Sequence, residues 1–347
     1  MREAFLYLFH KHQRIVIESG VAPRIVRFPS APPTNNTILE KETTTEMSSF
    51  LTIMLITCDT LCEDIQMDFD LRTPDSAYAF VLSILGMSGE QFIDEYLLEC
   101  NQDYEKFWIK HSNRLKHFDA SRIRIWAFHI TGSLDRCNSI KKIGLRNLRY
   151  ALTTNSSMSR MFQKYGLEFD IPNKTMYFRG TPYDVDYDKY RNRSNLYGED
   201  RYLKSIASRL YRDYCVNGFM CCDSPRDYGF DVCIRPEFIV DLLNMFPELC
   251  DLDLEWRQKS ISYKVNFFVY LHQLERFNFD LDQYRDPPYN DWRNLNDNDK
   301  IVKWMLGRAI DRAFNELCDT YLFVKSDLYV PANQIFDCEK IETTSSL

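Results

Sequence analysis

Glycine and long apolar runs are both scarce in this chain. Only 11 of its 347 residues are glycine, whereas aromatic residues make up 14%, a balance typical of packed mixed structure rather than of a fibrous protein. The longest apolar run, Phe50 to Thr57, is eight residues long, well short of the ~20 needed to span a bilayer. At the N-terminus Leu6 to Phe9 gives way at once to His10, which breaks the pattern of a secretory signal. We therefore expect a cytoplasmic protein with no membrane partner.

Several common nucleotide-binding and catalytic motifs are also missing. The chain contains no G-x-G-x-x-G, no G-x-x-x-x-G-K-[ST], no H-E-x-x-H and no G-x-S-x-G. These absences argue against a Rossmann dehydrogenase, a P-loop ATPase, a zinc metalloprotease and an α/β-hydrolase.

The cysteines lack the spacing of a metal site. Eleven are present and none forms C-x-x-C; the closest groupings are Cys58 with Cys62 and the adjacent pair Cys221 and Cys222. Six scattered histidines do not complete a four-ligand zinc site. We expect no metal, and reduced thiols in a cytoplasm that act mostly as small buried hydrophobes.

The formal net charge of -7 conceals a basic block in the middle of the chain. Between Lys110 and Tyr150 ten basic residues face two acidic ones, Asp119 and Asp135, so the block carries +8 and the remainder -15. Such a block attracts a phosphorylated ligand or a nucleic acid. A solvated helix face with basic strand edges explains the same composition equally well. The acidic remainder argues against indiscriminate coating of nucleic acid.

Local patterns divide the chain into three parts. Residues 1–49 form an N-terminal arm and a Pro- and Thr/Glu-rich linker, Pro29 to Ser49, with Met47 as an alternative start. Residues 50–120 carry helical signals, among them the N-cap pair Thr73-Pro74 and the capping box Ser88-Gly-Glu-Gln91. Residues 121–340 mix strands and helices without a βαβ rhythm. The predicted fold class is α+β, a helical subdomain followed by a mixed, mainly antiparallel sheet domain.

Individual elements of the third part are predicted from periodicity and turn residues. Strands are expected at 122–129, 168–171, 175–178, 183–185, 230–234, 261–271, 321–324 and 327–330, and helices at 137–143, 203–215, 236–245 and 301–317.

The most informative stretch is Phe128-His129-Ile130-Thr131 at the end of a predicted strand. A helix beginning near Asn138 follows it and stops at Gly144-Leu145. His129 and Thr131, two apart in a strand, point to the same face and present hydrogen-bonding groups to one cleft. This pattern resembles the first strand and helix of the ADP-ribosyltransferase fold, especially the DNA-targeting ADP-ribosyltransferase toxins. The resemblance covers about 20 residues closely and extends over 121–340 by element order.

The resemblance implies NAD as substrate and a set of site residues. His129, Thr131 and Asn138 match the positions that bind NAD, and His129 holds the nicotinamide ribose. The catalytic acid is Glu237, in Arg235-Pro-Glu-Phe-Ile-Val240, with Asp319 as the rival. The aromatic residue that stacks on nicotinamide is Tyr177 or Tyr228. A toxin or phage-defence effector of this kind modifies DNA, RNA or another macromolecule, and a neutralising antitoxin protein is the partner expected with it.

Two other interpretations stay open. A lone strand histidine is more often structural than catalytic, and Glu237 at a helix start complements the helix dipole. The alternative function is a non-enzymatic interaction module that docks a partner through the basic residues 110–150.

Overall fold

The computed structural model describes residues 66–223, 233–281, 291–315 and 319–342. The predicted arm, linker and alternative start lie outside the described residues, as do Phe50 to Thr57 and residues 230–232 of the predicted strand 230–234. The remaining two residues of that predicted strand, 233 and 234, form a turn. Over the described ranges the chain is a mixture of helices and mainly antiparallel strands, which confirms the predicted α+β class. None of the described helices is long and apolar enough to cross a bilayer.

The first described segment is mostly helical, and two of its helices begin at the predicted capping residues. Its elements are β1 (Asp68–Phe69), α3 (Pro74–Leu85), α4 (Gly89–Phe92), the π-helix η1 (Ile93–Glu99) and α5 (Tyr104–Leu115). Thr73 caps α3 in a capping box with Ser76, and Pro74 takes the first helical position. Ser88 caps α4 as predicted, but the Gln91 side chain donates to Glu95 instead of completing the box.

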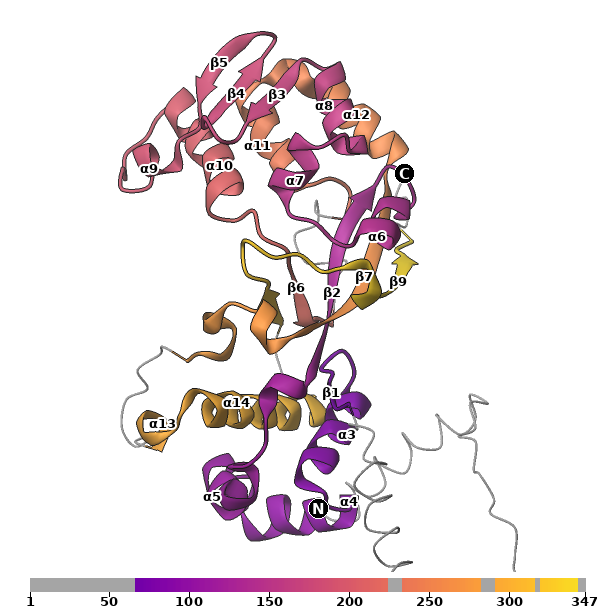
Figure 1. Cartoon of the computed structure of the whole chain (residues 1–347), viewed down its shortest axis with the longest axis vertical. Helices are drawn as coiled ribbons and strands as arrows, with labels where there is room; N and C mark the ends of the chain where they lie inside the picture. Colours follow the sequence, from indigo (N-terminus) through magenta and orange to yellow (C-terminus); the bar gives the residue numbers. More distant parts are fainter. Residues whose placement is uncertain (1–65, 224–232, 282–290, 316–318, 343–347) are drawn as a thin grey trace, which may run out of the picture. The chain divides into compact units, whose positions relative to one another are not determined.

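The main sheet is organised around a long central strand. Its order is β8-β6-β2-β7-β9, with β1 pairing parallel to β2 and all other pairs antiparallel (Figure 1). The bounds are β2 (Arg124–Ser133), β6 (Asn217–Cys221), β7 (Ile261–Tyr270), β8 (Thr320–Phe323) and β9 (Ile335–Lys340). The register places His129 opposite Val265 on β7, and Val265 opposite Cys338 on β9. Directly opposed residues point to the same face, so these three side chains share one face of the sheet.

The predicted strand 327–330 is a turn followed by irregular chain, with a single bridge from Val330 to Leu145. The last strand is instead β9, and the polar residues at 337, 339 and 340 obscured it in the sequence.

A second, smaller sheet is the predicted meander. It contains β3 (Leu167–Asp170), β4 (Thr175–Phe178) and β5 (Thr181–Asp184) in antiparallel order. It belongs to a core of its own with α7 (Leu148–Thr153), α8 (Ser157–Lys164), α9 (Tyr187–Tyr190), α10 (Glu199–Tyr211), α11 (Glu237–Met245) and α12 (Cys250–Lys259) (Figure 1). The fully buried Tyr190 and Trp256 lie in this core.

The largest core joins the N-terminal helices to the main sheet. Phe69, Phe107, Val269 and Leu306 belong to this one cluster, so buried contacts continue across residue 120. The helix that supplies Leu306 is α14 (Asp297–Ala313), capped by Asn296. The remaining short elements are α6 (Asn138–Ile143), α13 (Asp291–Asn294), η2 (Ala120–Arg122), η3 (Pro247–Leu249), η4 (Leu271–Gln273), η5 (Arg276–Phe279) and η6 (Ala332–Gln334).

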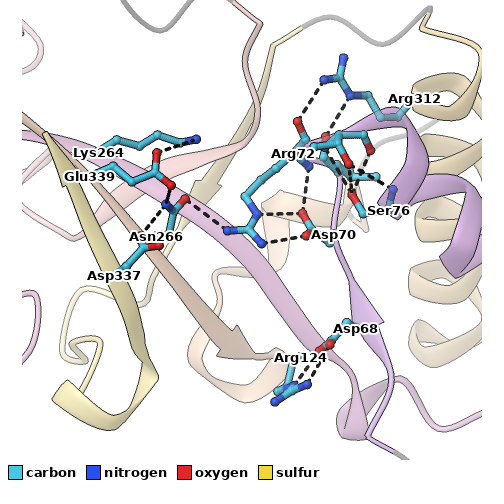
Figure 2. Close-up of polar contacts among 12 residues, drawn as sticks. Asp68, Asp70, Arg72, Ser76, Arg124, Lys264, Asn266, Arg312, Asp337 and Glu339 are labelled. Atoms are coloured by element: carbon cyan, nitrogen blue, oxygen red, sulfur yellow. Dashed lines mark hydrogen bonds and ion pairs between the residues drawn. The ribbon is translucent and has the colours of Figure 1, made fainter. Parts of the chain in front are cut away.

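A polar network on the sheet ties β9 to the segment before α3 (Figure 2). The buried Asn266 of β7 donates through Nδ2 to Asp337 at 2.7 Å and to Glu339 at 2.9 Å. Its Oδ1 accepts from Arg72 at 3.2 Å, and Arg72 also forms a bidentate ion pair with Asp70. One amide therefore satisfies charged groups from two segments far apart in the sequence.

Candidate functional site

The central strand β2 presents His129 in a half-buried position. The His129 Nδ1 lies 2.7 Å from the backbone carbonyl oxygen of Asn217 on β6. A carbonyl oxygen only accepts, so Nδ1 carries the proton and Nε2 is left as an acceptor. Burial lowers the pKa of His129, and the bond to Asn217 opposes that shift only partly. His129 is therefore a neutral imidazole near pH 7.

The turn after β2 is held by its own side chains. Ser133 Oγ donates to Asp135 Oδ1 at 2.9 Å and accepts from the Cys137 amide at 2.8 Å. Asp135 Oδ2 accepts from the Ser139 amide at 2.9 Å, at the start of α6. Burial favours a higher pKa for Asp135, but the hydrogen bonds from Ser139 and Ser133 outweigh it and lower the pKa. The side chains of Ser133 and Asp135 thus form hydrogen bonds within the turn that connects β2 to α6.

Helix α6 ends where the backbone must pass close to another segment. Gly144 has φ of +86°, and a Cβ atom at this position would overlap the Val330 carbonyl oxygen. Leu145 and Val330 exchange backbone hydrogen bonds of 2.8 and 3.1 Å immediately afterwards. Glycine is required here for both its positive φ and its missing side chain. The predicted stop at Gly144-Leu145 thus fixes the C-terminal end of α6.

A cavity of about 340 Å³ adjoins β2, α6, α7 and α11. Its wall includes His129 and Thr131 from β2, Tyr150 from α7, and Glu237 from the first turn of α11. This volume is at the lower end of the ~300–1,000 Å³ typical of small-molecule sites. The structure therefore brings three of the predicted site residues, His129, Thr131 and Glu237, to one cavity.

Glu237 belongs to a cluster of three carboxylates around one guanidinium. Arg209 Nη1 lies 2.8 Å from Glu237 and 2.6 Å from Asp213, and Arg209 Nε lies 3.3 Å from Asp241. Burial lowers the pKa of Arg209, but the carboxylates together outweigh it and raise the pKa. Burial raises the pKa of Asp241 despite Arg209. With all groups ionised the cluster is net negative, and Glu237 is its most exposed carboxylate.

A larger cavity of about 770 Å³ shares part of this wall. Arg209, Asp213, Tyr214 and Cys215 line both cavities. The acidic cluster therefore lies where a ligand longer than one cavity would pass from the first to the second.

The basic block has two parts along the chain. In the first part, Lys110, Arg122 and Arg124 each contact a carboxylate. The second part contains Arg136, Lys141, Lys142, Arg146 and Arg149, and none of them has an acidic partner among the described residues.

Two of these arginines are held by aromatic rings. Arg146 lies 3.3 Å from the ring centre of Tyr329 and 4.9 Å from that of Tyr150, and Arg149 lies 3.6 Å from the ring centre of Tyr214. The unpaired positive charge therefore follows α6 and α7, and Arg146 is itself part of the cavity wall.

The other predicted site residues do not line this cavity. Asn138 is exposed at the first position of α6, whereas its neighbours Ser139 and Ile140 are in the wall. Asp319 lines a different cavity, with Trp304 and Arg308. Tyr177 lies on β4 of the small sheet, and Tyr228 is outside the described residues.

Sequence reasoning did not find several residues that shape the site. Arg209, Tyr214 and the Asn217 carbonyl are contributed by α10 and the chain after it, which had no motif. One local signal was available, because Arg209 and Asp213 stand four apart on a predicted helix and form an i, i+4 pair. Nothing in the sequence connected that pair with Glu237.

Within the described residues, no group of three or more His, Cys, Asp and Glu side chains is arranged to hold a metal ion. Comparison with known proteins gives no match to a family model, a curated protein or a solved structure.

Proposed function

We propose that the chain is an NAD-dependent ADP-ribosyltransferase, with NAD bound in the cavity of His129, Thr131 and Glu237. The observation that carries the proposal is this convergence. His129 and Thr131 of β2 line the same cavity as Glu237 of α11, although they are far apart in the sequence. The short motif on β2 and the acidic position on α11 were each predicted from the sequence. A dinucleotide has two nucleotide parts, and the two cavities that share a wall offer a place for each part.

The neutral His129 suits the binding of a ribose hydroxyl. Its Nδ1–H is committed to the Asn217 carbonyl, so Nε2 accepts a hydrogen bond from a hydroxyl group of the ligand. Thr131, on the same face of β2, offers a second hydroxyl contact. Together they hold the sugar whose bond to nicotinamide breaks.

The acidic cluster suits the charge that develops in this reaction. Departure of nicotinamide leaves an oxocarbenium-like centre, and fixed negative charge nearby lowers its energy. Arg209 orients the Glu237 carboxylate through a 2.8 Å contact while Asp213 and Asp241 keep the cluster net negative. Glu237 is thereby positioned by its neighbours and remains exposed enough to contact a ligand.

The acceptor proposed is a nucleic acid. Of the unpaired cations from Arg136 to Arg149, Arg146 lines the cavity and the others precede or follow it along α6 and α7. Phosphates are the ligands that such a strip attracts. Contacts with the rings of Tyr150 and Tyr329 restrict the Arg146 side chain and so lower the entropy lost on binding a phosphate.

The test uses the full chain with NAD labelled on its adenylate part, together with DNA, RNA or total protein. We expect label in one acceptor fraction, and Glu237→Gln to lower transfer by roughly 100-fold or more. Glu248→Gln, at an exposed acid on η3, is the matched control and should transfer like the unmodified chain. If no fraction is labelled and NAD does not raise the melting temperature, the proposal fails.

A second candidate rests on the same unpaired cations. A non-enzymatic module would dock a polyanionic partner through Arg136 to Arg149 and have no need of NAD. Thermal melting separates the two functions, because a ligand that binds only the folded chain raises its melting temperature. The module predicts stabilisation by the partner and none by NAD.

A further inference from the structure

A third cavity, of about 190 Å³, lies between the start of α5 and one face of α14 (Figure 1). Its wall is contributed by the first two residues of α5, by Trp292 of α13 and by α14. No residue of this wall lines either cavity of the candidate site. The proposed function therefore leaves this cavity without a role.

The α14 side of the wall is a single helical face. Its residues stand at positions 303, 304, 307, 308 and 311, which recur at the spacing of one face of a helix. A Cβ atom at Gly307 would lie 3.2 Å from Cζ of Tyr104, so glycine lets the tyrosine ring approach the helix closely. The Tyr104 hydroxyl donates to the backbone carbonyl oxygen of Lys303. Tyr104 is thereby fixed against α14 as one part of the wall.

Three side chains of this face have N–H groups to spare. Trp304 is 6% exposed, and its Nε1 has no hydrogen-bond partner within the described residues. Lys303 is 5% exposed, and its ammonium donates to Glu105 at 2.5 Å, one of the three hydrogen bonds it can make. Arg308 lies 4.0 Å from Asp280, which is too far for a hydrogen bond. Because buried donors without acceptors are costly, this face indicates a ligand that brings acceptor oxygens.

The same wall carries an equal number of negative charges. Burial raises the pKa of Tyr104 well above its usual value, and the charges of Glu105 and Asp311 add to the rise. The two acids and the two cations, Lys303 and Arg308, sum to zero. A simple carboxylate or a simple amine would give the occupied cavity a net charge. A zwitterion adds none and brings a partner for groups of each sign.

Volume and aromatic rings restrict the rest of the ligand. A cavity of about 150 Å³ binds benzene, so this one has room for about eight non-hydrogen atoms. Tyr104, Trp292 and Trp304 supply the aromatic part of the wall, which suits an aliphatic group.

We propose that this cavity binds a free α-amino acid as its zwitterion, with an aliphatic side chain of the size of that in valine. Arg308 and the Trp304 Nε1–H bind the carboxylate, and Asp311 binds the ammonium group. The Lys303–Glu105 pair offers further donors and acceptors to the same two groups. The site is independent of the proposed transferase activity, because the two share no residue.

Calorimetric titration of the full chain with L-valine tests the proposal. We expect saturable binding and a rise in melting temperature, because a ligand that binds only the folded chain stabilises it. Two analogues each lack one charged group: 3-methylbutanoate has no ammonium, and 2-methylpropylamine has no carboxylate. Each should bind at least about tenfold more weakly than L-valine, since the partners of the missing group stay unsatisfied.

Variants of the wall separate the two charged groups. Arg308→Gln and Asp311→Asn should each weaken L-valine binding about tenfold or more. Arg308→Gln should leave the affinity for 2-methylpropylamine unreduced, and Asp311→Asn the affinity for 3-methylbutanoate. Arg201→Gln on α10 and Asp327→Asn, both at exposed positions, are the matched controls and should bind L-valine like the unmodified chain.

Trp304→Phe tests the indole N–H by itself. It keeps an aromatic ring and removes a donor that has no partner in the free chain. L-valine binding should weaken about tenfold, as for a hydrogen bond to a charged group, while removal of the N–H itself costs the free chain no hydrogen bond.

The proposal is overturned if L-valine at millimolar concentration neither releases heat nor raises the melting temperature. It is also overturned if either analogue binds as tightly as L-valine, or if Arg201→Gln lowers the affinity as much as Arg308→Gln. Since neither NAD nor a nucleic acid is present, a failure here is distinct from a failure of the proposed transferase.

Discussion

His129 is the residue at which a binding role and a structural role predict different measurements. Replacing it with Ala removes the acceptor Nε2 and the bond to the Asn217 carbonyl. If Nε2 binds the ligand, NAD affinity or transfer falls roughly ten- to a hundredfold, equivalent to about 1–3 kcal/mol. The free energy of unfolding falls by about 0.5–1.5 kcal/mol, the value of one ordinary hydrogen bond. Calorimetry with NAD and urea denaturation measure the two effects.

His117→Ala, at an exposed histidine, is the control and should change neither quantity. The pH dependence adds a second check. Because burial depresses the pKa of His129, the folded chain binds fewer protons than the unfolded one below about pH 6.5, so stability is lost as pH falls from there towards the folded pKa. The chain with His129 should lose stability relative to His129→Ala over that interval. An unchanged difference in stability between the two chains would contradict a neutral, half-buried imidazole at His129.

Single residues of the site were predictable where the signal is local. His129 and Thr131 share a face because side chains alternate along any strand, and Gly144 ends α6 because its positive φ suits glycine. Asn138 was matched by motif position, but the first residue of α6 is exposed while the next two line the cavity. The approach of Glu237 to Arg209 depends on the packing of α11 against α10, which no local pattern encodes.

Among the elements, β7 depends on the polar network of Asn266 (Figure 2). Asn266→Asp removes the Nδ2 donor shared by Asp337 and Glu339 and places a third carboxylate between them. We expect a loss of about 2–4 kcal/mol in the free energy of unfolding at pH 7. Crowding by like charges raises the folded pKa of the new carboxyl, so this deficit relative to the unmodified chain should shrink as pH falls through that pKa.

Urea denaturation at pH 7 and pH 5 measures this change. Asn294→Asp, at an exposed position of α13, introduces the same charge without the neighbours and should cost less than about 0.5 kcal/mol at either pH. Equal effects of the two substitutions would show that the amide does not connect β9 to β7.

Elements with strong end signals were predicted well, and those defined by their partners were not. Thr73-Pro74 fixes the start of α3, and the turn residues at 172–174 and 179–180 separate β3, β4 and β5. β9 was missed because its sequence, Ile-Phe-Asp-Cys-Glu-Lys, has polar residues whose partners, Asn266 and Lys264, lie on the neighbouring strand and far away in the sequence. The apolar faces of α3 and α5 predict burial, but the sequence does not say that α14 and the main sheet cover them.

At the scale of the whole molecule, charge is segregated. The total is -7, yet the block from Lys110 to Tyr150 carries +8. Ion pairs offset part of its first half, so the unpaired charge is concentrated between Arg136 and Arg149. An acidic molecule with one basic strip should orient a polyanion at that strip and repel it elsewhere.

The orientation can be tested through the salt dependence of nucleic-acid binding. Lys141 and Lys142 are exposed on α6 and have no acidic partner among the described residues. If both contact phosphates of duplex DNA, replacing both with Gln should make the negative slope of log K against log salt less steep by about 1.8, because each phosphate contact contributes ~0.9 to its magnitude.

Lys164→Gln with Lys259→Gln removes the same net charge from two residues that are paired to Glu255. This matched double variant should keep the original slope, since its lysines are held by Glu255 outside the strip. Titrations of fluorescent duplex DNA between 50 and 200 mM salt give the three slopes. Equal loss in the two double variants would mean that net charge alone governs binding, and would contradict a phosphate site on α6.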